Sequence, residues 1–179
     1  DGGFYHFLTF FNHPDFGIIM RNTLSLSLLK LLFAFPLPIV FALALNEMRG
    51  TKIKRIVQTV SYLPHFISWV IVYGLAFTLL NTASGVVNEV LYRLGYKKIE
   101  FLTQASHFWP MAVVTDVWKE LGWWSIILLA AMTGIDPSQY ESARVDGASR
   151  LKCIWHITLP NIKGTMAVVL ILSIGALMS

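Results

Sequence analysis

Along the chain, long runs of hydrophobic positions alternate with shorter polar segments, and four apolar stretches stand out. They cover approximately residues 22–45, 59–80, 108–132 and 165–179. A helix needs about 20 mainly apolar residues to cross a bilayer, and the first three stretches reach that length. They are too continuous for the alternating strands of a membrane barrel, and lipid admits only helices or closed barrels. The pattern therefore predicts an all-α, polytopic transmembrane helical bundle with four spans, of which the last is truncated.

Prolines and chain ends add detail to this prediction. Pro36 and Pro38 lie inside the first stretch, where proline usually kinks a helix and a gating hinge is the alternative interpretation. The chain starts at Asp1 without a Met and stops inside its fourth stretch, so we expect it to be cut at both ends. It has no basic segment followed by a short apolar run, which would mark a signal peptide.

Composition supports a membrane protein and argues against a soluble one. Hydrophobic residues make up 55% of the 179 residues and charged residues 13%, with a mean hydropathy of +0.61. A net charge of +4 would suggest nucleic acid in a soluble chain, but here the distribution of loop charges accounts for it, and no nucleic-acid partner is expected. The single cysteine, Cys153, cannot form an internal disulfide.

The loop charges predict the orientation, because cytoplasmic loops carry an excess of Lys and Arg. The loop after the first stretch and the loop after the third must share one side, because two spans separate them. Together these two loops carry eight basic residues: Arg49, Lys52, Lys54, Arg55, Arg144, Arg150, Lys152 and Lys163. The other side carries four, Arg21, Arg93, Lys97 and Lys98, diluted by Glu89 and Glu100. We therefore expect an extracytoplasmic segment at 1–21, a transmembrane domain at 22–179 and a cytoplasmic loop at about 134–162.

Three charged residues interrupt the third stretch. Asp116, Lys119 and Glu120 are spaced so that one face of a helix carries all three, and Asp116 could pair with Lys119. Charges at membrane depth are costly and usually face a bundle interior or an aqueous cavity. Two interpretations stay open: a wall of a possible translocation path, or a structural ion pair near the outer end of a long helix.

The loop at 134–162 has clear helix signals. Asp136 is a good N-cap, Pro137 suits the first helical position, and Gln139 lies where a capping box places its glutamine. Gly147 can end that helix in a left-handed conformation, and a second short helix can begin after Ser149. The expected result is two short helices with a glycine corner, lying along the membrane surface. Such a shape could anchor in the lipid interface or fill a groove on a cytosolic partner, and composition alone slightly favours the anchor.

The sequence ESARVDGASRLKCIWHITLP resembles the EAA loop of binding-protein-dependent ABC importer permeases, in which E-A-A-x-x-x-G is followed after nine residues by I-x-L-P. The residues that match in register are Glu141, Ala143, Asp146, Gly147, Ala148, Ile157, Leu159 and Pro160. Ser142 departs from the pattern, where the family usually has alanine. The stretches NEMRGTKIKRIVQTVSYLPHFISWVIV and VWKELGWWSIILLAAMTGIDPSQYE resemble the sugar-uptake branch, the polysaccharide-type permeases related to the maltose system.

This resemblance covers most of the chain from about residue 22, and it implies a MetI-like permease fold with one further helix before and one after the given chain. It implies that Glu141 pairs with groups in the cleft of a cytosolic ABC ATPase dimer, that Gly147 makes the turn, and that Ala143 and Ala148 allow close seating. The implied partners are that ATPase, a second permease subunit, an extracytoplasmic solute-binding protein and membrane lipid. For the permease pair a heterodimer is favoured and a homodimer stays open. The implied location is the bacterial plasma membrane, as a multi-pass protein.

Enzymatic chemistry is not expected of the chain itself. It lacks the G-x-x-x-x-G-K-[ST] phosphate loop, so ATP and magnesium would be bound by the partner ATPase and no cofactor by this chain. Its five histidines lack metal-ligand spacing, and no catalytic or metal site is expected. The leading hypothesis is a permease for a carbohydrate, an oligosaccharide in particular. The alternatives are a permease for a non-sugar solute and a membrane scaffold that transports nothing.

Overall fold

The structure is a computed structural model that describes residues 3–176. In chain order the elements are α1 (Tyr5–Phe11), α2 (Phe16–Ala34), α3 (Pro36–Glu47), α4 (Thr51–Tyr62), the 3-10 turn η1 (Leu63–Phe66), α5 (Trp69–Leu80), α6 (Val86–Arg93), α7 (Ala105–Thr133), α8 (Pro137–Val145), α9 (Arg150–Cys153), the π-helical turn η2 (Ile154–Thr158) and α10 (Leu159–Ala176). These residues contain no β-strand, and the predicted all-α architecture is confirmed.

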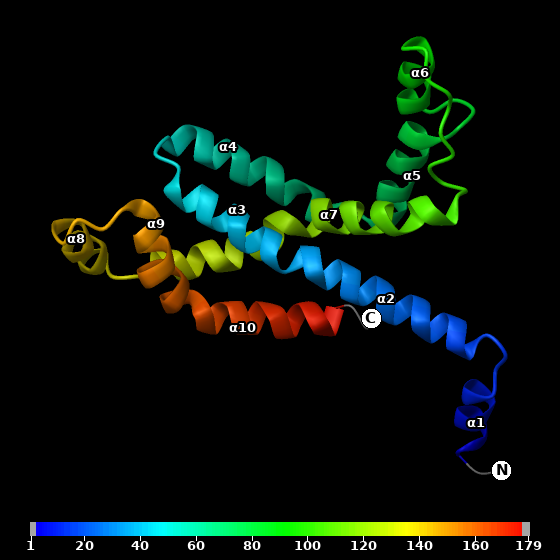
Figure 1. Cartoon of the computed structure of the whole chain (residues 1–179), viewed down its shortest axis with the longest axis horizontal. Helices are drawn as coiled ribbons and strands as arrows, with labels where there is room; N and C mark the ends of the chain where they lie inside the picture. The colour runs from blue at the N-terminus through cyan, green and yellow to red at the C-terminus, as the bar shows by residue number, and fades with distance from the viewer. Residues whose placement is uncertain (1–2, 177–179) are drawn as a thin grey trace.

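Helix α7 lies at the centre of the bundle, against α2, α3, α4 and α10 (Figure 1). The core joins α3, α7 and α10 through fully buried aliphatic side chains, among them Leu45, Leu128 and Val169. Large apolar side chains on the outer faces, such as Leu28 and Ile171, are exposed. Because lipid tails are as apolar as these side chains, close packing between helices is what stabilises such a bundle.

One glycine allows the closest approach in the bundle. Gly122 of α7 is buried against the backbone of α4, where an added Cβ would overlap the carbonyl of Ser61 and the amide of Tyr62. Small residues at helix interfaces let membrane helices approach in this way. Gly122 therefore sets the position of α4 on α7.

The first predicted span forms as the continuous pair α2–α3, which is long and apolar enough to cross a membrane over Phe16–Glu47. The helix begins at Phe16 rather than at Asn22, so the predicted boundary at 21/22 falls inside α2. Pro36 occupies the first position of α3, where its missing N–H costs little. The amide of Phe35 still donates to the carbonyl of Leu31, at 3.2 Å, which keeps the two helices in line.

The second predicted span, 59–80, is not one continuous helix. Thr51–Phe66 and Trp69–Leu80 meet at an angle of 103°. Proline removes a helical N–H and clashes with the preceding turn, and here Pro64 lies in the 3-10 turn that ends the first arm. Ile67 is extended, and Ser68 caps α5 by accepting a hydrogen bond from the amide of Ile71.

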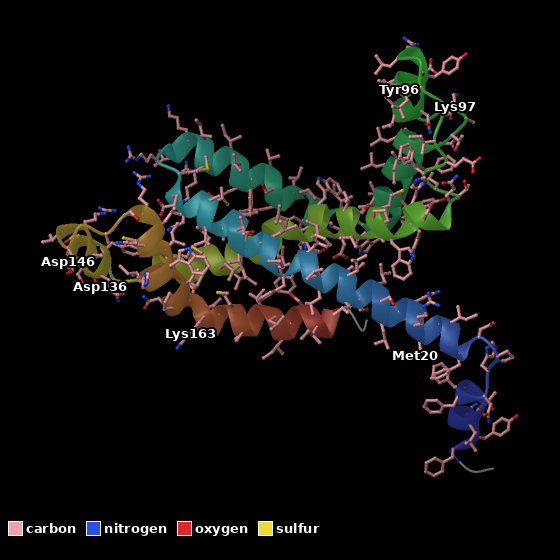
Figure 2. The ribbon with its side chains drawn as sticks, viewed as in Figure 1. Met20, Tyr96, Lys97, Asp136, Asp146 and Lys163 are labelled. Carbon is pink, nitrogen blue, oxygen red and sulfur yellow. The ribbon has the colours of Figure 1, made fainter. Side chains whose placement is uncertain are left out.

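Helices α5 and α6 form an arm that stands away from the bundle, at the end opposite to α8 (Figure 1). Figure 2 shows Tyr96 and Lys97 at the tip of this arm, far from Asp136 and Asp146. The buried amide of Asn88 holds the arm together, because it donates to the carbonyls of Leu80, Asn81 and Ile99 and accepts from the amide of Ile99 at 2.7 Å. The arm is therefore a fixed structure.

The third predicted stretch lies within α7, whose 29 residues span about 43 Å. By apolar composition alone α7 is not among the candidate spans, because it carries charges at its middle. The fourth stretch forms the second half of a helix over Arg150–Gly175 that is long and apolar enough to cross. Residues 177–179 of that stretch lie outside the described residues.

Candidate functional sites

The EAA-like segment forms a short helix that is fixed at its start. The Asp136 carboxylate accepts a hydrogen bond from the amide of Ser138 at 2.9 Å, which confirms the predicted N-cap. This backbone hydrogen bond lowers the pKa of Asp136. The predicted capping-box role of Gln139 is wrong, because its side-chain oxygen instead accepts a hydrogen bond from Asn161 Nδ2 at 2.9 Å.

The predicted glycine corner is confirmed. Gly147 has a φ of 76°, a left-handed conformation that costs little only without a Cβ. The amide of Ala148 donates to the carbonyl of Ala143 at 2.8 Å, and the amide of Gly147 donates to that of Arg144 at 3.0 Å. These two bonds make a Schellman motif, with Asp146 as the C-cap residue.

The second half of the segment differs from the prediction of a separate short helix. Ser149 caps a helix as expected, but α9, η2 and α10 then run on without a break. Pro160 lies inside this helix, where its ring would clash with the carbonyl four residues earlier. The wide turn over Ile154–Thr158, in which the amide of Leu159 donates to the carbonyl of Ile154, relieves the clash.

Two polar contacts that sequence reasoning missed attach α8 to this long helix. The Tyr140 hydroxyl is hydrogen-bonded to Thr158 Oγ1 at 2.9 Å, and Thr158 is buried. The second contact is the one between Gln139 and Asn161. The sequence did offer a signal for the first contact, because the hydroxyl of Thr158 in the apolar run IWHITLP needs a hydrogen-bond partner if it is buried. These two hydrogen bonds connect α8 directly to the start of the long helix.

The outer surface of the corner is accessible. Glu141 is exposed on α8 and, within residues 3–176, makes no ion pair. Ala143, Ala148 and Ile157 line a notch of about 320 Å³ between α8 and α9. Leu159 and Ile157 pack against the apolar core. Among the matched residues, Glu141 is thus open to the outside and Leu159 packs inward, whereas Ile157 contributes to both the notch and the core packing.

A second candidate site is a polar pocket of about 510 Å³ inside the bundle. We call it the polar pocket. Its charged and aromatic lining residues are Lys30, His65, Asp116, Glu120, Trp69, Trp123 and Trp124. They come from α2, from both sides of the α4–α5 bend, and from α7. The prediction that Asp116 and Glu120 share one face of α7 fits this placement.

The predicted pair between Asp116 and Lys119 is wrong. Asp116 Oδ1 accepts from Lys30 Nζ of α2 at 3.0 Å. Lys119 is 6% exposed and does not line the pocket. Its ammonium donates to the carbonyl of His65 at 2.7 Å, and it lies 3.3 Å from Glu120 Oε1. The bend at Pro64 removes the helical partner of that carbonyl, and Lys119 replaces it.

His65 itself is clamped between two residues of α7. Its Nδ1 lies 2.9 Å from Glu120 Oε2. Its ring stacks on Trp123, with centroids 4.3 Å apart and planes at 4°. His65 is therefore a packed histidine. Among the described residues no cluster of His, Cys, Asp and Glu could hold a metal ion.

Sequence reasoning missed Lys30 as a partner. The signal was present, because a lysine in the middle of the apolar run SLLKLLF needs an opposite charge nearby. Which carboxylate would supply it could not be read from the sequence, since Asp116 lies 86 positions along the chain.

The structure thus combines a helix–glycine–helix corner at one end of an all-α bundle with a charged pocket within it. Residues 34–179 match the family model described as "Binding-protein-dependent transport system inner membrane component". The chain belongs to this family, whose members are membrane permease subunits and not themselves enzymes.

Named relatives and solved structures are close. The chain is 48% identical to the polygalacturonan/rhamnogalacturonan transport system permease protein YteP of Bacillus subtilis (strain 168), over 97% of this chain and 54% of that protein. It superposes with a TM-score of 0.93 and 47% identity on a crystal structure of a bacterial ABC transporter involved in the import of the acidic polysaccharide alginate, covering 99% of this chain and 62% of that one.

A second crystal structure is of the bacterial alginate ABC transporter in complex with an alginate pentasaccharide-bound periplasmic protein. It matches with a TM-score of 0.92 and 48% identity, over 98% of this chain and 61% of that one. The chain thus spans little more than half the length of the curated relatives it matches.

Proposed function

We propose that the chain is the transmembrane permease subunit of an ATP-driven ABC importer and forms a translocation path for a carbohydrate, an oligosaccharide in particular. The observation that carries the proposal is the α8 corner, where Glu141 and the left-handed Gly147 lie exposed at one end of the bundle. Sugar-transport permeases among the relatives and an importer of a polysaccharide among the similar structures support it.

In this proposal α8 and the Gly147 corner couple to a separate cytosolic ATPase dimer, which binds ATP and magnesium. Glu141 meets polar or basic groups in the ATPase cleft, and Ala143 and Ala148 allow close seating. The contacts between Tyr140 and Thr158 and between Gln139 and Asn161 then transmit a displacement of α8 to the long helix. Rigid-body switching between two packed arrangements is a common means of such transmission.

In this proposal the polar pocket forms part of the translocation path for the carbohydrate. Its three tryptophans offer flat faces on which sugar rings stack, and its carboxylates can accept hydrogen bonds from sugar hydroxyls. Its lining combines apolar and aromatic side chains with placed polar groups, and such a combination is typical of small-molecule sites. Asp116 and Glu120 belong to this wall, whereas Lys119 holds the bend behind it.

The proposed topology places residues 1–21 and the α5–α6 arm outside the cytoplasm and the loop at 134–162 inside. The arm then faces an extracytoplasmic solute-binding protein, and a second permease subunit completes the path as a heterodimer. The separation of the arm from α8 in Figure 1 is consistent with this arrangement.

The test uses the full-length protein, purified in mild detergent from its native membrane, with co-purifying proteins identified by mass spectrometry. The variants are Glu141→Lys and Gly147→Pro. The matched control is Glu89→Lys on the arm, an exposed acidic residue at the opposite end. We expect an ATPase to co-purify with wild type and with the control, and to be lost from both loop variants.

Transport is measured in parallel as uptake of neutral and acidic oligosaccharides. We expect Glu120→Gln to reduce uptake at least tenfold without loss of the ATPase. Recovery of the chain without any ATPase in all forms would favour a scaffold, and uptake of only a non-sugar solute would overturn the substrate class.

A further inference from the structure

Another pocket, separate from the polar pocket of the proposed translocation path, lies between the end of α3 and the α8–α9 corner. Its volume is about 590 Å³, and it is lined by Asn46, Glu47, Met48, Arg49, Tyr140, Arg144, Ala148, Arg150 and Cys153. We call it the arginine pocket. The lining contains three arginines and one glutamate. Arg150 Nη1 lies 3.7 Å from Glu47 Oε2, which leaves Arg49 and Arg144 without a carboxylate among the lining residues.

The arginine pocket lies where the two helices that contain the candidate spans end. Glu47 ends one candidate span and Arg150 begins the other, and both line the pocket. Where two spanning helices leave the bilayer, their end residues lie at the level of the lipid headgroups. We therefore place the pocket near the lipid headgroups, on the side that the loop charges assign to the cytoplasm.

The residues on either side of the pocket alternate basic and exposed apolar side chains. On α4, Lys52, Lys54 and Arg55 are interleaved with Ile53 and Ile56, which are 61% and 63% exposed. On the other side Leu151 and Trp155, one helical turn apart, are 69% and 67% exposed. In water such apolar exposure would be unfavourable. At a bilayer surface the apolar groups insert and the long basic side chains reach the phosphates.

We propose that the arginine pocket binds the phosphate headgroup of an anionic phospholipid of the cytoplasmic leaflet. Guanidinium groups fit phosphate oxygens in a bidentate manner and are less strongly hydrated than ammonium groups. Basic pockets between membrane helices on the cytoplasmic side suit such headgroups. Because Arg144 and Ala148 belong to the α8 corner, the bound lipid ties the corner to the end of α3.

The inference depends on the proposed topology and not on transport activity, so it is tested by lipid binding. The purified full-length complex is titrated with phosphatidylglycerol, and with phosphatidylcholine as the neutral reference, and bound lipid is counted by native mass spectrometry. The variants are Arg49→Gln and the double variant Arg49→Gln/Arg144→Gln. Lys163→Gln is the matched control, since it removes one positive charge from an exposed position outside the pocket.

We expect wild type and the Lys163 variant to retain phosphatidylglycerol in preference to phosphatidylcholine. Each arginine near an anionic headgroup contributes about 1 kcal/mol, so binding should weaken about fivefold in the single and about thirtyfold in the double variant. The double variant Arg49→Lys/Arg144→Lys keeps both positive charges but cannot bind phosphate in a bidentate manner. It should recover part of the affinity that the Arg49→Gln/Arg144→Gln variant loses.

Three results would overturn the proposal. Equal phosphatidylglycerol binding by wild type and the double variant would remove the arginines from any lipid site. Displacement of the lipid by inorganic phosphate at equal concentration would assign the pocket to a soluble anion. Unchanged lipid binding with loss of the co-purified ATPase would assign the arginines to the ATPase contact.

Discussion

Gly147 shows how a single residue fixes a functional turn. Its φ of 76° closes two backbone hydrogen bonds that end α8, and no neighbouring atom lies near the position of a Cβ. A side chain there would meet conformational strain and no steric clash. A substitution at Gly147 therefore tests the cost of the backbone conformation alone, without a contribution from side-chain packing.

We expect Gly147→Ala to destabilise the corner by about 1 kcal/mol, since a left-handed conformation costs an L-residue that much. Gly147→Asn should cost less, because asparagine adopts this region more readily. Limited proteolysis between α8 and α9 in the purified complex measures the difference. Equal cleavage of the alanine and asparagine variants would show that backbone strain at position 147 does not determine the stability of the corner.

Asp136 gives the corner a pH dependence. The hydrogen bond from Ser138 holds the pKa of Asp136 below its ordinary value of 3.8. A lowered pKa in the folded state means that the cap stabilises α8 fully above the unfolded pKa. The stabilisation is lost as the pH falls through the folded value.

We expect hydrogen-exchange protection of the first turn of α8, corrected for intrinsic rates, to decline below about pH 4 in the wild type. Asp136→Asn keeps an oxygen acceptor at the cap and has no charge to lose, so its protection should not change over that range. A parallel decline in both proteins would place the titrating group elsewhere.

At the scale of elements, the contact between α4 and α7 depends on the absence of one side chain. Gly122 faces the backbone of Ser61 and Tyr62 with no room for a methyl group. Three further α7 side chains, Lys119, Glu120 and Trp123, then hold the bend through His65. Contacts from α7 thus add to the local effect of Pro64 in fixing the bend.

We expect Gly122→Ala to destabilise the bundle by about 1–3 kcal/mol, as overpacking does in close-packed interiors. Gly164→Ala in α10 is the control, because open space surrounds that glycine, and alanine there should stabilise the helix by up to about 1 kcal/mol. Thermal unfolding of both variants in one detergent measures the two effects, which should have opposite signs.

At the scale of the whole molecule, one ion pair links the first spanning helix to the central one. Lys30 and Asp116 have side chains that are 22% and 16% exposed, and their charged atoms are 3.0 Å apart. Removing one partner from a buried pair leaves an uncompensated charge, which costs about 3–5 kcal/mol, whereas removing both costs far less. The partial exposure here places the expected cost at the lower end.

We therefore expect Lys30→Met and Asp116→Asn each to lower the unfolding temperature, and the double variant to recover most of the loss. The comparison pair is Arg93–Glu89 on the arm, whose side chains are 75% and 50% exposed. That pair should contribute at most about 1 kcal/mol. If the loss of unfolding temperature in the double variant equalled the sum of the losses in the Lys30 and Asp116 single variants, the two charges would not interact.

The sequence by itself determined the helical membrane class, the apolar stretches, the N-caps at Asp136 and Ser149, and the left-handed corner at Gly147. Each of these depends on hydropathy or on hydrogen bonds between residues close in the chain, which composition and spacing encode directly. The EAA-like pattern likewise indicated the family, since all its matched residues lie within one short segment.

Only the tertiary structure decided the 103° bend, the partner of Asp116, the role of Lys119 and the contact of Gln139 with Asn161. Each of these depends on which distant groups come within hydrogen-bonding distance. Lys119 could have paired with Asp116 on its own helix, but the bend at Pro64 exposes a carbonyl 54 positions away that accepts its proton at 2.7 Å. A buried polar group takes whichever partner the packed helices bring to it, and helix packing is a property of the whole fold.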